Sequence, residues 1–422
     1  MKIQETIYEM RHQPVITTVS IIGTALAIFL IMTVVMMNQV MVAPFAPESN
    51  RDRWLVNRYL SLKAVNEEGD NNAAMSYHTA DEIYHRLPTA ETVTIFGSNY
   101  MTLCSAPGGT PINVEAKTVD DQFWKVMDFT YIDGVPFDKA QFDGGEPLVV
   151  IDKSVAQRLY NTPEAAGKDI RINYVDYKVC GVVEDVSPIA DMAFSEIWIP
   201  ISSTNQLNYS WRDGIMGAFH AIILAKTPSD FPQIRREFEE SHRKFFNEFD
   251  GKYEYIQRER PYDQEVSAHT IGANLGPDMK RVRNFNYIIY AILLIVPAIN
   301  LSSMTHSRLR RQEEIIGVKR AFGATRANIL IDLLIENFLI TLIAGCVGLL
   351  LSVIFAYFAS NALFTQGFID HNVDTQFSAI MIMQWNTFGY ALAFCFILNL
   401  VSTGLPSILA ARTNIVNALS KR

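Results

Sequence analysis

Cysteine is scarce in this chain of 422 residues, which contains only four. None of the four lies in a CxxC or CxxH spacing, so the common zinc and thiol-redox motifs are excluded. Cys346 and Cys395 lie in long apolar runs. Cys104 and Cys180 lie in a polar part of the chain, where two interpretations stay open: a disulfide, or small apolar residues in a core. The strand-like YKVCGVV around Cys180 favours the second.

Motifs for catalysis and phosphate binding are missing as well. The chain has no GxxxxGK[ST] loop, no HExxH and no GxSxG, and its histidines are scattered. Adjacent acids such as Asp120–Asp121 and Glu184–Asp185 point to opposite faces of a strand, so we interpret them as solvated rather than as acid–base pairs. We therefore expect no catalytic, metal or cofactor site on this chain, and no enzymatic activity of its own.

Long apolar runs are abundant by contrast. A helix needs about 20 apolar residues to cross a bilayer, and four runs reach that length with almost no charge. Buried helices of a large soluble core are the weaker alternative. The first run is too long for the apolar core of a signal peptide, so we interpret it as an uncleaved anchor. The four predicted spans cover residues 15–42, 285–304, 333–360 and 383–411.

The distribution of lysine and arginine predicts the topology, because these residues concentrate in cytoplasmic loops. Six of them lie between residues 305 and 327, whereas none lies between 363 and 382. Both termini and the first of these loops are therefore expected in the cytoplasm. The predicted order is a cytoplasmic segment (1–14), span 15–42, an exterior domain (43–284), span 285–304, a cytoplasmic loop and helix (305–332), span 333–360, an exterior loop (361–382), span 383–411 and a cytoplasmic tail (412–422).

The predicted exterior domain is acidic, with 36 acidic and 25 basic residues. That balance suits a water-facing domain and argues against nucleic acid or anionic lipid as its ligand. Its patterns predict an α+β fold. Residues 146–160 read as a buried strand followed by a helix capped by Ser154, and 219–246 as a strand, a turn and a helix capped by Ser229 or Asp230. Residues 169–186 read as one long strand, and 66–76 as a mobile loop.

Small and polar residues mark the predicted spans. Ala344, Gly348 and Ser352 are spaced by four and form a smooth helix face on which another helix can pack closely. Ordinary use of small residues in a membrane helix is the alternative. Asn300 is costly in lipid unless it faces protein, so it is expected to point inward, and Glu336 is the one charged residue of the third predicted span.

The cytoplasmic loop is more elaborate than a positively charged anchor needs to be. Its sequence EEIIGVKRAFGATR combines charge with two glycines, two alanines and a phenylalanine, and Thr325 is expected to cap the helix that follows. We interpret the loop as a docking surface. The expected docking residues are Glu313, Glu314, Gly317, Val318, Lys319, Arg320, Ala321, Phe322, Gly323 and Ala324.

The stretch IGVKRAFGATRANILIDLLIEN resembles the signature of the MacB/FtsX-type ABC transporter permeases, in which a glycine-and-arginine loop precedes a helix with a glutamate. EPLVVIDKSVAQRLY and the later VCGVV are similar to the family's exterior domain, and MRHQPVITTVSIIGTALAIF to its first span. The resemblance covers nearly the whole chain. Ile315 departs from the family's usual glutamate, and Ile415 from its usual proline.

This resemblance implies a bacterial inner-membrane protein with four transmembrane helices and a large α+β extracytoplasmic domain between the first and the second. It implies a permease subunit that dimerises with itself or with a related permease, and that binds an ABC ATPase through the loop. ATP and magnesium would be held by that ATPase, since this chain shows no Walker A motif. Membrane lipid and a periplasmic adaptor or outer-membrane protein are further partners that the family implies; nucleic acid is not.

Two functions follow from the resemblance. In the first, ATP hydrolysis by the partner drives movement of the exterior domain for efflux, lipoprotein release or envelope remodelling. In the second, the chain is a membrane regulator without transport, which relays signals or controls a cell-wall enzyme as FtsX does. The large exterior domain favours the first, because FtsX-type exterior domains are smaller.

Overall fold

A computed structural model describes residues 14–65, 67–270, 272–292, 323 and 325–364, together with 295 and 388–390, 392–393 and 396–397. It divides into two compact units. We call residues 41–279 the α+β unit. The helical unit comprises the chain up to Val40 and most of the residues from Lys280 onward.

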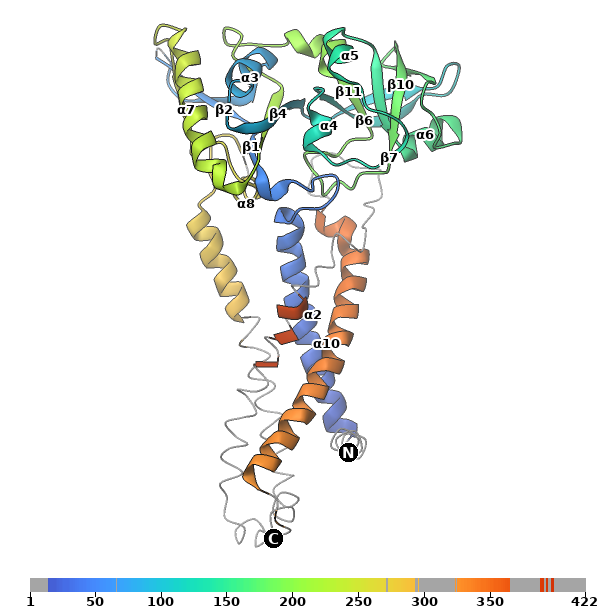
Figure 1. Cartoon of the computed structure of the whole chain (residues 1–422), viewed down its shortest axis with the longest axis vertical. Coiled ribbons are helices and arrows are strands. Elements are labelled where there is room, and N and C mark those ends of the chain that lie inside the picture. The colour runs from blue at the N-terminus through green and yellow to red at the C-terminus, as the bar shows by residue number, and fades with distance from the viewer. Residues whose placement is uncertain are drawn as a thin grey trace. The chain divides into compact units, whose positions relative to one another are not determined.

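The helical unit contains three long helical segments within its described residues. Helix α2 spans Pro14–Val42, residues 279–292 form a second helix, and α10 spans Arg326–Phe364 (Figure 1). Two stretches are long and apolar enough to cross a membrane, Thr17–Val42 and Phe338–Ala356. The second helix begins before predicted residue 285, and α10 continues through the predicted boundaries at 332 and 360. These helices extend beyond the apolar runs, so the end of an apolar run does not mark the end of a helix.

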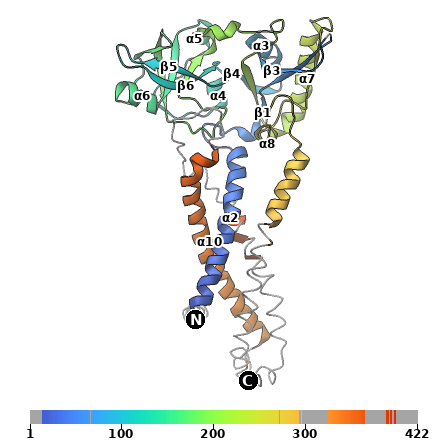
Figure 2. The same ribbon diagram turned by 180° about the vertical axis from the view of Figure 1, so that it is seen from behind.

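The α+β unit has two lobes that share one sheet (Figures 1 and 2). The first, which we call the sheet lobe, comprises residues 54–97 and 216–270. Its centre is β13, whose seven residues are all buried and which pairs antiparallel with β4 and β1. The strands of this lobe are β1 (Trp54–Asn57), β2 (Leu60–Ala64), β3 (Asn71–Met75), β4 (Ala90–Gly97), β12 (Met216–Gly217), β13 (Phe219–Ala225) and β14 (Tyr253–Tyr255).

Residues 98–203 form the second lobe, which we call the barrel lobe. Its strands close in the order β11-β8-β10-β9-β5-β6, because β11 pairs with both β8 and β6. Closure leaves no free edge in this ring and surrounds a separate apolar cluster that includes Val114, Ile151 and Ile197. The strands are β5 (Tyr100–Ser105), β6 (Ile112–Val119), β7 (Tyr131–Gly134), β8 (Leu148–Asp152), β9 (Asp169–Ile172), β10 (Val175–Val183) and β11 (Ile197–Pro200).

Helices cover the outside of both lobes. On the sheet lobe, α3 and α7 pack against each other, and Tyr84 of α3 contacts Phe238 of α7. The main hydrophobic core runs from this lobe to Trp198 of the barrel lobe, so the two lobes share apolar packing. The helices are α3 (Tyr77–Tyr84), α4 (Phe123–Val126), α5 (Lys139–Asp143), α6 (Lys153–Tyr160), α7 (Phe231–Asn247) and α8 (Gln264–Ala268); the 3₁₀ turns are Arg51–Arg53, Ile201–Ser203, Asn205–Asn208 and Pro228–Asp230.

The strand–helix predictions for 146–160 and 219–246 are confirmed by β8–α6 and β13–α7. The predicted cap of α6 was wrong: Asp152, not Ser154, accepts the hydrogen bond from Val155 N at 2.7 Å. Asp230 does precede α7, but its carboxylate accepts from Thr227 instead of capping the helix, and Ser229 does not cap it either.

Two further predictions were wrong. Residues 169–186 form a hairpin rather than one strand, because Asn173 and Tyr174 adopt positive φ and turn the chain between β9 and β10. Tyr174 is 85% exposed at this turn, whereas Ile170 and Ile172 are buried as predicted. The predicted mobile loop 66–76 contains β3, which pairs with β2 and β12.

Candidate functional site

The predicted docking loop lies largely outside the described residues. Of its ten residues the structure describes only Gly323, which has φ +94°; no heavy atom of the described residues lies within 4 Å of the position a Cβ would take. A side chain there would be strained by the backbone without any steric neighbour. The other nine lie outside the described residues: Glu313, Glu314, Gly317, Val318, Lys319, Arg320, Ala321, Phe322 and Ala324.

The helix that follows this loop begins as predicted. Thr325 Oγ1 accepts a hydrogen bond from Asn328 N at 3.2 Å, so Thr325 caps α10. Glu336 lies within α10, but its side chain is outside the described residues, as is the whole of Asn300.

The small residues of α10 lie against α2. Ala344 and Ser352 are fully buried, and a Cβ added at Gly348 would lie 2.6 Å from the carbonyl oxygen of Ala25. Such a distance is too short for any side chain, so only glycine permits this approach of the two backbones. Phe29 and Phe355 meet edge to face at 5.5 Å in the same helix pair. The spacing of Ala344, Gly348 and Ser352 in the sequence did not identify the helix that packs against this face.

The most connected polar site of the described structure lies at the start of the α+β unit. Met41 and Val42, the last residues of α2, belong to this unit. Gln264 Nε2 donates to Met41 O at 2.8 Å, and Gln264 Oε1 accepts from Trp54 Nε1 at 2.8 Å. The amide of Gln264 therefore connects the end of α2 to the fully buried indole of the first strand, β1.

A buried ion pair follows immediately along the chain. Glu48 is 0% exposed and Arg51 3%, and Arg51 Nε lies 2.6 Å from Glu48 Oε2. Arg51 also donates to Ala43 O at 3.2 Å and to Ile189 O at 3.0 Å, and it covers the ring of Phe45. We call Glu48, Arg51 and Gln264 the junction clamp, because together they bind the backbone that follows α2.

The junction clamp also reaches the barrel lobe. Glu48 Oε1 accepts from Met192 N at 2.8 Å and from Ala193 N at 2.9 Å. These residues belong to the segment 187–196, which leads from β10 to β11 of the barrel lobe. A carboxylate that accepts two backbone N–H groups and an arginine is held in one position, since nearly all its acceptor capacity is used.

Further charged residues bind the same segment, 187–196. Lys117 of β6 is 2% exposed, and its Nζ donates to Met192 O at 2.5 Å and to Asp191 O at 3.3 Å. Burial lowers the pKa of Lys117 to about 8. Arg58 pairs with the Asp191 carboxylate, and the charge of Arg58 lowers the pKa of Asp191 to about 2.

His220 of β13 completes this network. Its Nδ1 lies 2.6 Å from Arg58 O and its Nε2 lies 2.7 Å from Ser98 Oγ. Burial, followed by the charges of Arg58 and Lys117, lowers the pKa of His220 to about 4, so the ring is neutral at pH 7. The network connects β13 of the sheet lobe to β6 and the 187–196 segment.

Sequence reasoning missed this site. Glu48 and Arg51 are three residues apart but match no motif, and Lys117 and His220 lie far from them in the sequence, so no local signal identifies the set. The interpretation of Asp120 as a solvated acid was wrong. It is buried, and it accepts from Thr94 Oγ1 at 2.6 Å and Ile95 N at 2.7 Å. Burial raises the pKa of Asp120 to about 7.

The two cysteines of the α+β unit do not form a disulfide. Cys104 is buried in the barrel core, and Cys180 Sγ donates to Val149 O at 3.3 Å. Their role as small core residues is thereby confirmed. Among the described residues no group of three or more metal-ligating side chains lies close enough to hold an ion.

Two family models match the chain. The MacB-like periplasmic core domain matches residues 17–241 and the FtsX-like permease C-terminal domain matches 287–415. A macrolide export ATP-binding/permease protein MacB of Escherichia coli K12 is 23% identical over 250 residues, which are 58% of this chain and 36% of that protein. An uncharacterized ABC transporter permease, YknZ of Bacillus subtilis, is 22% identical over 231 residues, 55% of this chain and 54% of that one.

The chain spans between a third and a little over half of the length of these relatives. Solved structures with a similar part include the extracellular domain of YknZ and the periplasmic region of MacB from Actinobacillus actinomycetemcomitans. Each has 13% sequence identity and a TM-score of 0.34, and each covers 47% of this chain; the match covers 99% of the YknZ domain and 88% of the MacB region.

Proposed function

Because the chain belongs to the MacB/FtsX family of ABC transporter permeases, we propose that it couples ATP hydrolysis by a separate ATPase subunit to movement of its extracytoplasmic α+β unit. Members of this family are bacterial inner-membrane proteins of transporters that contain an ATPase. The proposed movement serves efflux, lipoprotein release or envelope remodelling. No catalytic residue is assigned to this chain; ATP and magnesium are held by the partner.

The junction clamp is the observation that supports this proposal. A helix that transmits motion needs a stiff connection to the domain it moves, since a flexible linker would absorb the displacement. Here Gln264 binds the backbone in the last turn of α2, at Met41, and Arg51 binds the backbone just after it, at Ala43. Glu48 extends the connection to Met192 and Ala193 of the barrel lobe, while Gln264 belongs to the sheet lobe. A displacement of the chain at residues 41–43 would therefore be passed to both lobes of the α+β unit.

The ATPase contact is assigned to the cytoplasmic loop before α10. The sequence of this loop combines a lysine and arginines with small residues around Phe322, and the loop precedes the capped start of that helix. Both termini are placed in the cytoplasm and four helices across the membrane, as the charge distribution predicts. The subunit is proposed to work as a dimer, with itself or with a related permease. A periplasmic adaptor or outer-membrane protein is a further proposed partner.

One pair of substitutions tests the ATPase contact. Gly323 and Gly69 have almost the same φ, +94° and +95°, and among the described residues neither has a heavy atom within 4 Å of an added Cβ. The variants Gly323→Asp and Gly69→Asp therefore carry the same strain in two places, the loop before α10 and the α+β unit. Affinity purification of the full chain from native membranes should recover an ABC ATPase with the wild type and with Gly69→Asp, and lose it with Gly323→Asp.

Equal recovery of the ATPase with both variants would contradict the assigned docking surface. If the wild type recovers no ATPase, and instead a kinase or cell-wall hydrolase, the transport proposal fails and the chain is a regulator. Membrane insertion of all three proteins is measured in the same preparation, so that loss of the partner is not confused with loss of the permease.

A further inference from the structure

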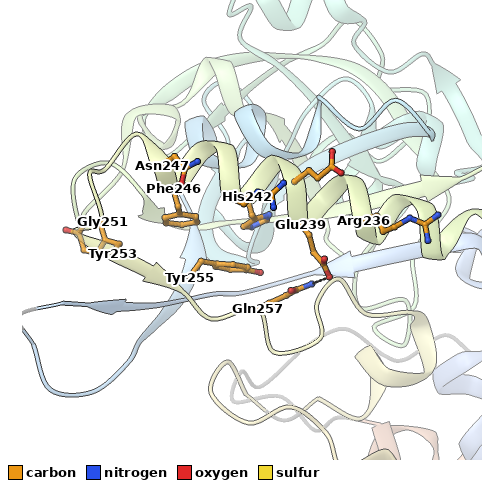
Figure 3. Close-up of a pocket in the computed structure, with 11 residues that line it drawn as sticks. Arg236, Glu239, His242, Phe246, Asn247, Gly251, Tyr253, Tyr255 and Gln257 are labelled. Atoms are coloured by element: carbon orange, nitrogen blue, oxygen red, sulfur yellow. Dashed lines mark hydrogen bonds between the residues drawn. The ribbon is translucent and has the colours of Figure 1, made fainter.

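Residues 257–264, which we call the tie segment, lead from β14 into the first residue of α8 in the sheet lobe. Helix α7 holds this segment at two points. Figure 3 shows Gln257 beside Glu239 of α7, and the dashed line marks the hydrogen bond of 2.9 Å from Gln257 Nε2 to Glu239 Oε1. Further along, Arg235 Nε of α7 donates to Pro261 O at 3.2 Å. The tie segment is therefore fixed to the longest helix of the lobe.

Arg260, in the middle of the tie segment, is 2% exposed. Its Nη1 donates to Tyr59 O at 2.7 Å and to Ser61 Oγ at 3.1 Å, and its Nη2 donates to Ala273 O. No carboxylate within the described part of the chain pairs with this guanidinium. A buried arginine without a counter-charge is rare, because desolvation of its charge is costly. Its planar fork of N–H groups instead holds oxygens of two separate chain segments in a fixed arrangement.

Ala273 matters because of its place in the chain. Residues 272–279 lead out of the α+β unit to the helix of residues 279–292, so Ala273 lies near the second connection between the two units. The first connection is at Met41, whose carbonyl oxygen accepts from Gln264 Nε2. Arg260 and Gln264 are four residues apart. One short segment therefore binds the backbone at both connections.

A second arginine of the tie segment provides a natural comparison. Arg258 Nε donates to Ser61 Oγ at 3.2 Å, and its Nη2 donates to Asp70 Oδ2 at 2.6 Å. Both arginines thus bind Ser61, but the hydrogen bonds of Arg258 stay within the sheet lobe, whereas Arg260 also binds Ala273. Replacement of each by glutamine separates the contact at Ala273 from the contact at Ser61.

We infer that Arg260 is a positioning residue that fixes the second connection, so that the tie segment holds both connections against one lobe. The consequence rests on the proposed function: displacement of the chain at either connection is passed to the same rigid part of the α+β unit. Without Arg260, residues 272–278 become a free linker, and a free linker absorbs displacement instead of passing it on.

A distance measurement within the α+β unit tests the contact. Spin labels are placed by Val65→Cys and Leu275→Cys, at side chains that are 67% and 70% exposed, in the full chain in lipid nanodiscs. The chain without these two cysteines, treated with the same reagent, gives the background. Double electron–electron resonance should show a narrow distribution of distances in the labelled chain and in its Arg258→Gln variant. The Arg260→Gln variant should lose that narrow distribution.

Two outcomes of this measurement overturn the inference. One is a broad distribution in the labelled chain that retains Arg260, and this arm needs no arginine variant to fold. The other is a distribution in Arg260→Gln as narrow as that in Arg258→Gln.

The role of Arg260 in transmission is tested with the ATPase bound. Stimulation of ATP hydrolysis by the permease should be lost in Arg260→Gln and kept in Arg258→Gln, at a temperature where both variants are folded. A broadened distribution with unchanged stimulation overturns the role in transmission. The distance measurement contains no ATPase, so a chain that binds no ATPase refutes the proposed coupling but leaves the distance result standing.

Discussion

Glu48 and Arg51 form a fully buried ion pair, with 2.6 Å between Glu48 Oε2 and Arg51 Nε, within ten residues of the end of α2. The pair lies inside the α+β unit. Hydrogen bonds from the pair reach backbone groups at Ala43, Ile189, Met192 and Ala193. A buried pair of this kind positions chain segments more than it adds stability, because desolvation of the two charges offsets much of their attraction.

Substitution of Glu48 by glutamine should destabilise the α+β unit strongly. Arg51 would remain buried without a counter-charge, and loss of one partner of a buried pair typically costs about 3–5 kcal/mol. Thermal unfolding of the full chain in detergent measures the loss. Asp176→Asn removes one partner of the exposed Arg171–Asp176 pair and is the matched control, for which no measurable change is expected. A melting temperature for Glu48→Gln within error of that control would contradict the clamp.

The variant Gln264→Glu should separate stability from coupling. A glutamate retains the acceptor for Trp54 Nε1 but replaces the donor to Met41 O with a carboxylate oxygen, which repels that carbonyl. We expect a stability loss of about 1–3 kcal/mol, the range for an unsatisfied buried group. We also expect the partner's ATP hydrolysis to respond less to the permease. The readout is ATPase activity of the assembled complex at a temperature where the variant is folded; unchanged stimulation there would rule out a role of Gln264 in transmission.

Three glycines of the helical unit should differ in their tolerance of alanine. A Cβ at Gly348 meets Ala25 O at 2.6 Å, a Cβ at Gly345 meets the flexible end of Leu392 at 3.1 Å, and a Cβ at Gly389 meets nothing within 4 Å. The expected order of thermal destabilisation is therefore Gly348→Ala, then Gly345→Ala, with Gly389→Ala neutral. Fluorescence-detected gel filtration after heating compares all three. Equal melting of Gly348→Ala and Gly389→Ala would show that α2 and α10 do not pack through this face.

Stability of the α+β unit should depend on His220 below neutral pH. The pKa of His220 is lowered from 6.5 to about 4 in the folded state, chiefly by burial. The unfolded chain therefore binds more protons between these values, and the stability that neutral His220 contributes is present above pH 6.5 and is lost as the pH falls through 4. The full effect is of order 3 kcal/mol.

The test compares the wild type with His220→Gln from pH 7.5 to pH 4. Glutamine keeps hydrogen-bonding groups but does not titrate, so the free energy of unfolding should fall less steeply for the variant. Asp120 and Asp152, whose pKa values are raised by burial to about 7 and about 8, shift stability in the opposite direction in both proteins and cancel in the difference. Identical pH profiles for the two proteins would mean that His220 titrates normally.

Several elements were predictable because their signals are local. The run FHAIILA is apolar without interruption, and it forms the fully buried β13. Thr325 caps α10 because a hydroxyl that precedes a helix can reach the N–H three residues later. The strand-to-helix transition at Asp152 was likewise found, although the side chain that caps the helix was misassigned.

Other features were not predictable from the sequence. The alternation through Ile170, Ile172 and Tyr174 continues past the point where the chain turns, because two non-glycine residues with positive φ carry no sequence signal as strong as Asn-Gly. The polar segment Asn71–Met75 forms a strand because β2 and β12 pair with it, not because of its own composition.

The sequence by itself determined the family, the segregation of apolar helices from an acidic α+β region, and the small-residue face of α10. Each depends on composition or on spacing along one helix. Only the tertiary structure decided that this face meets Ala25 and Ile28 of α2, that six strands close into a barrel, and that Glu48, Arg51 and Gln264 clamp the chain after α2. Contacts between residues up to about 220 positions apart arise from packing and desolvation, which no local pattern encodes.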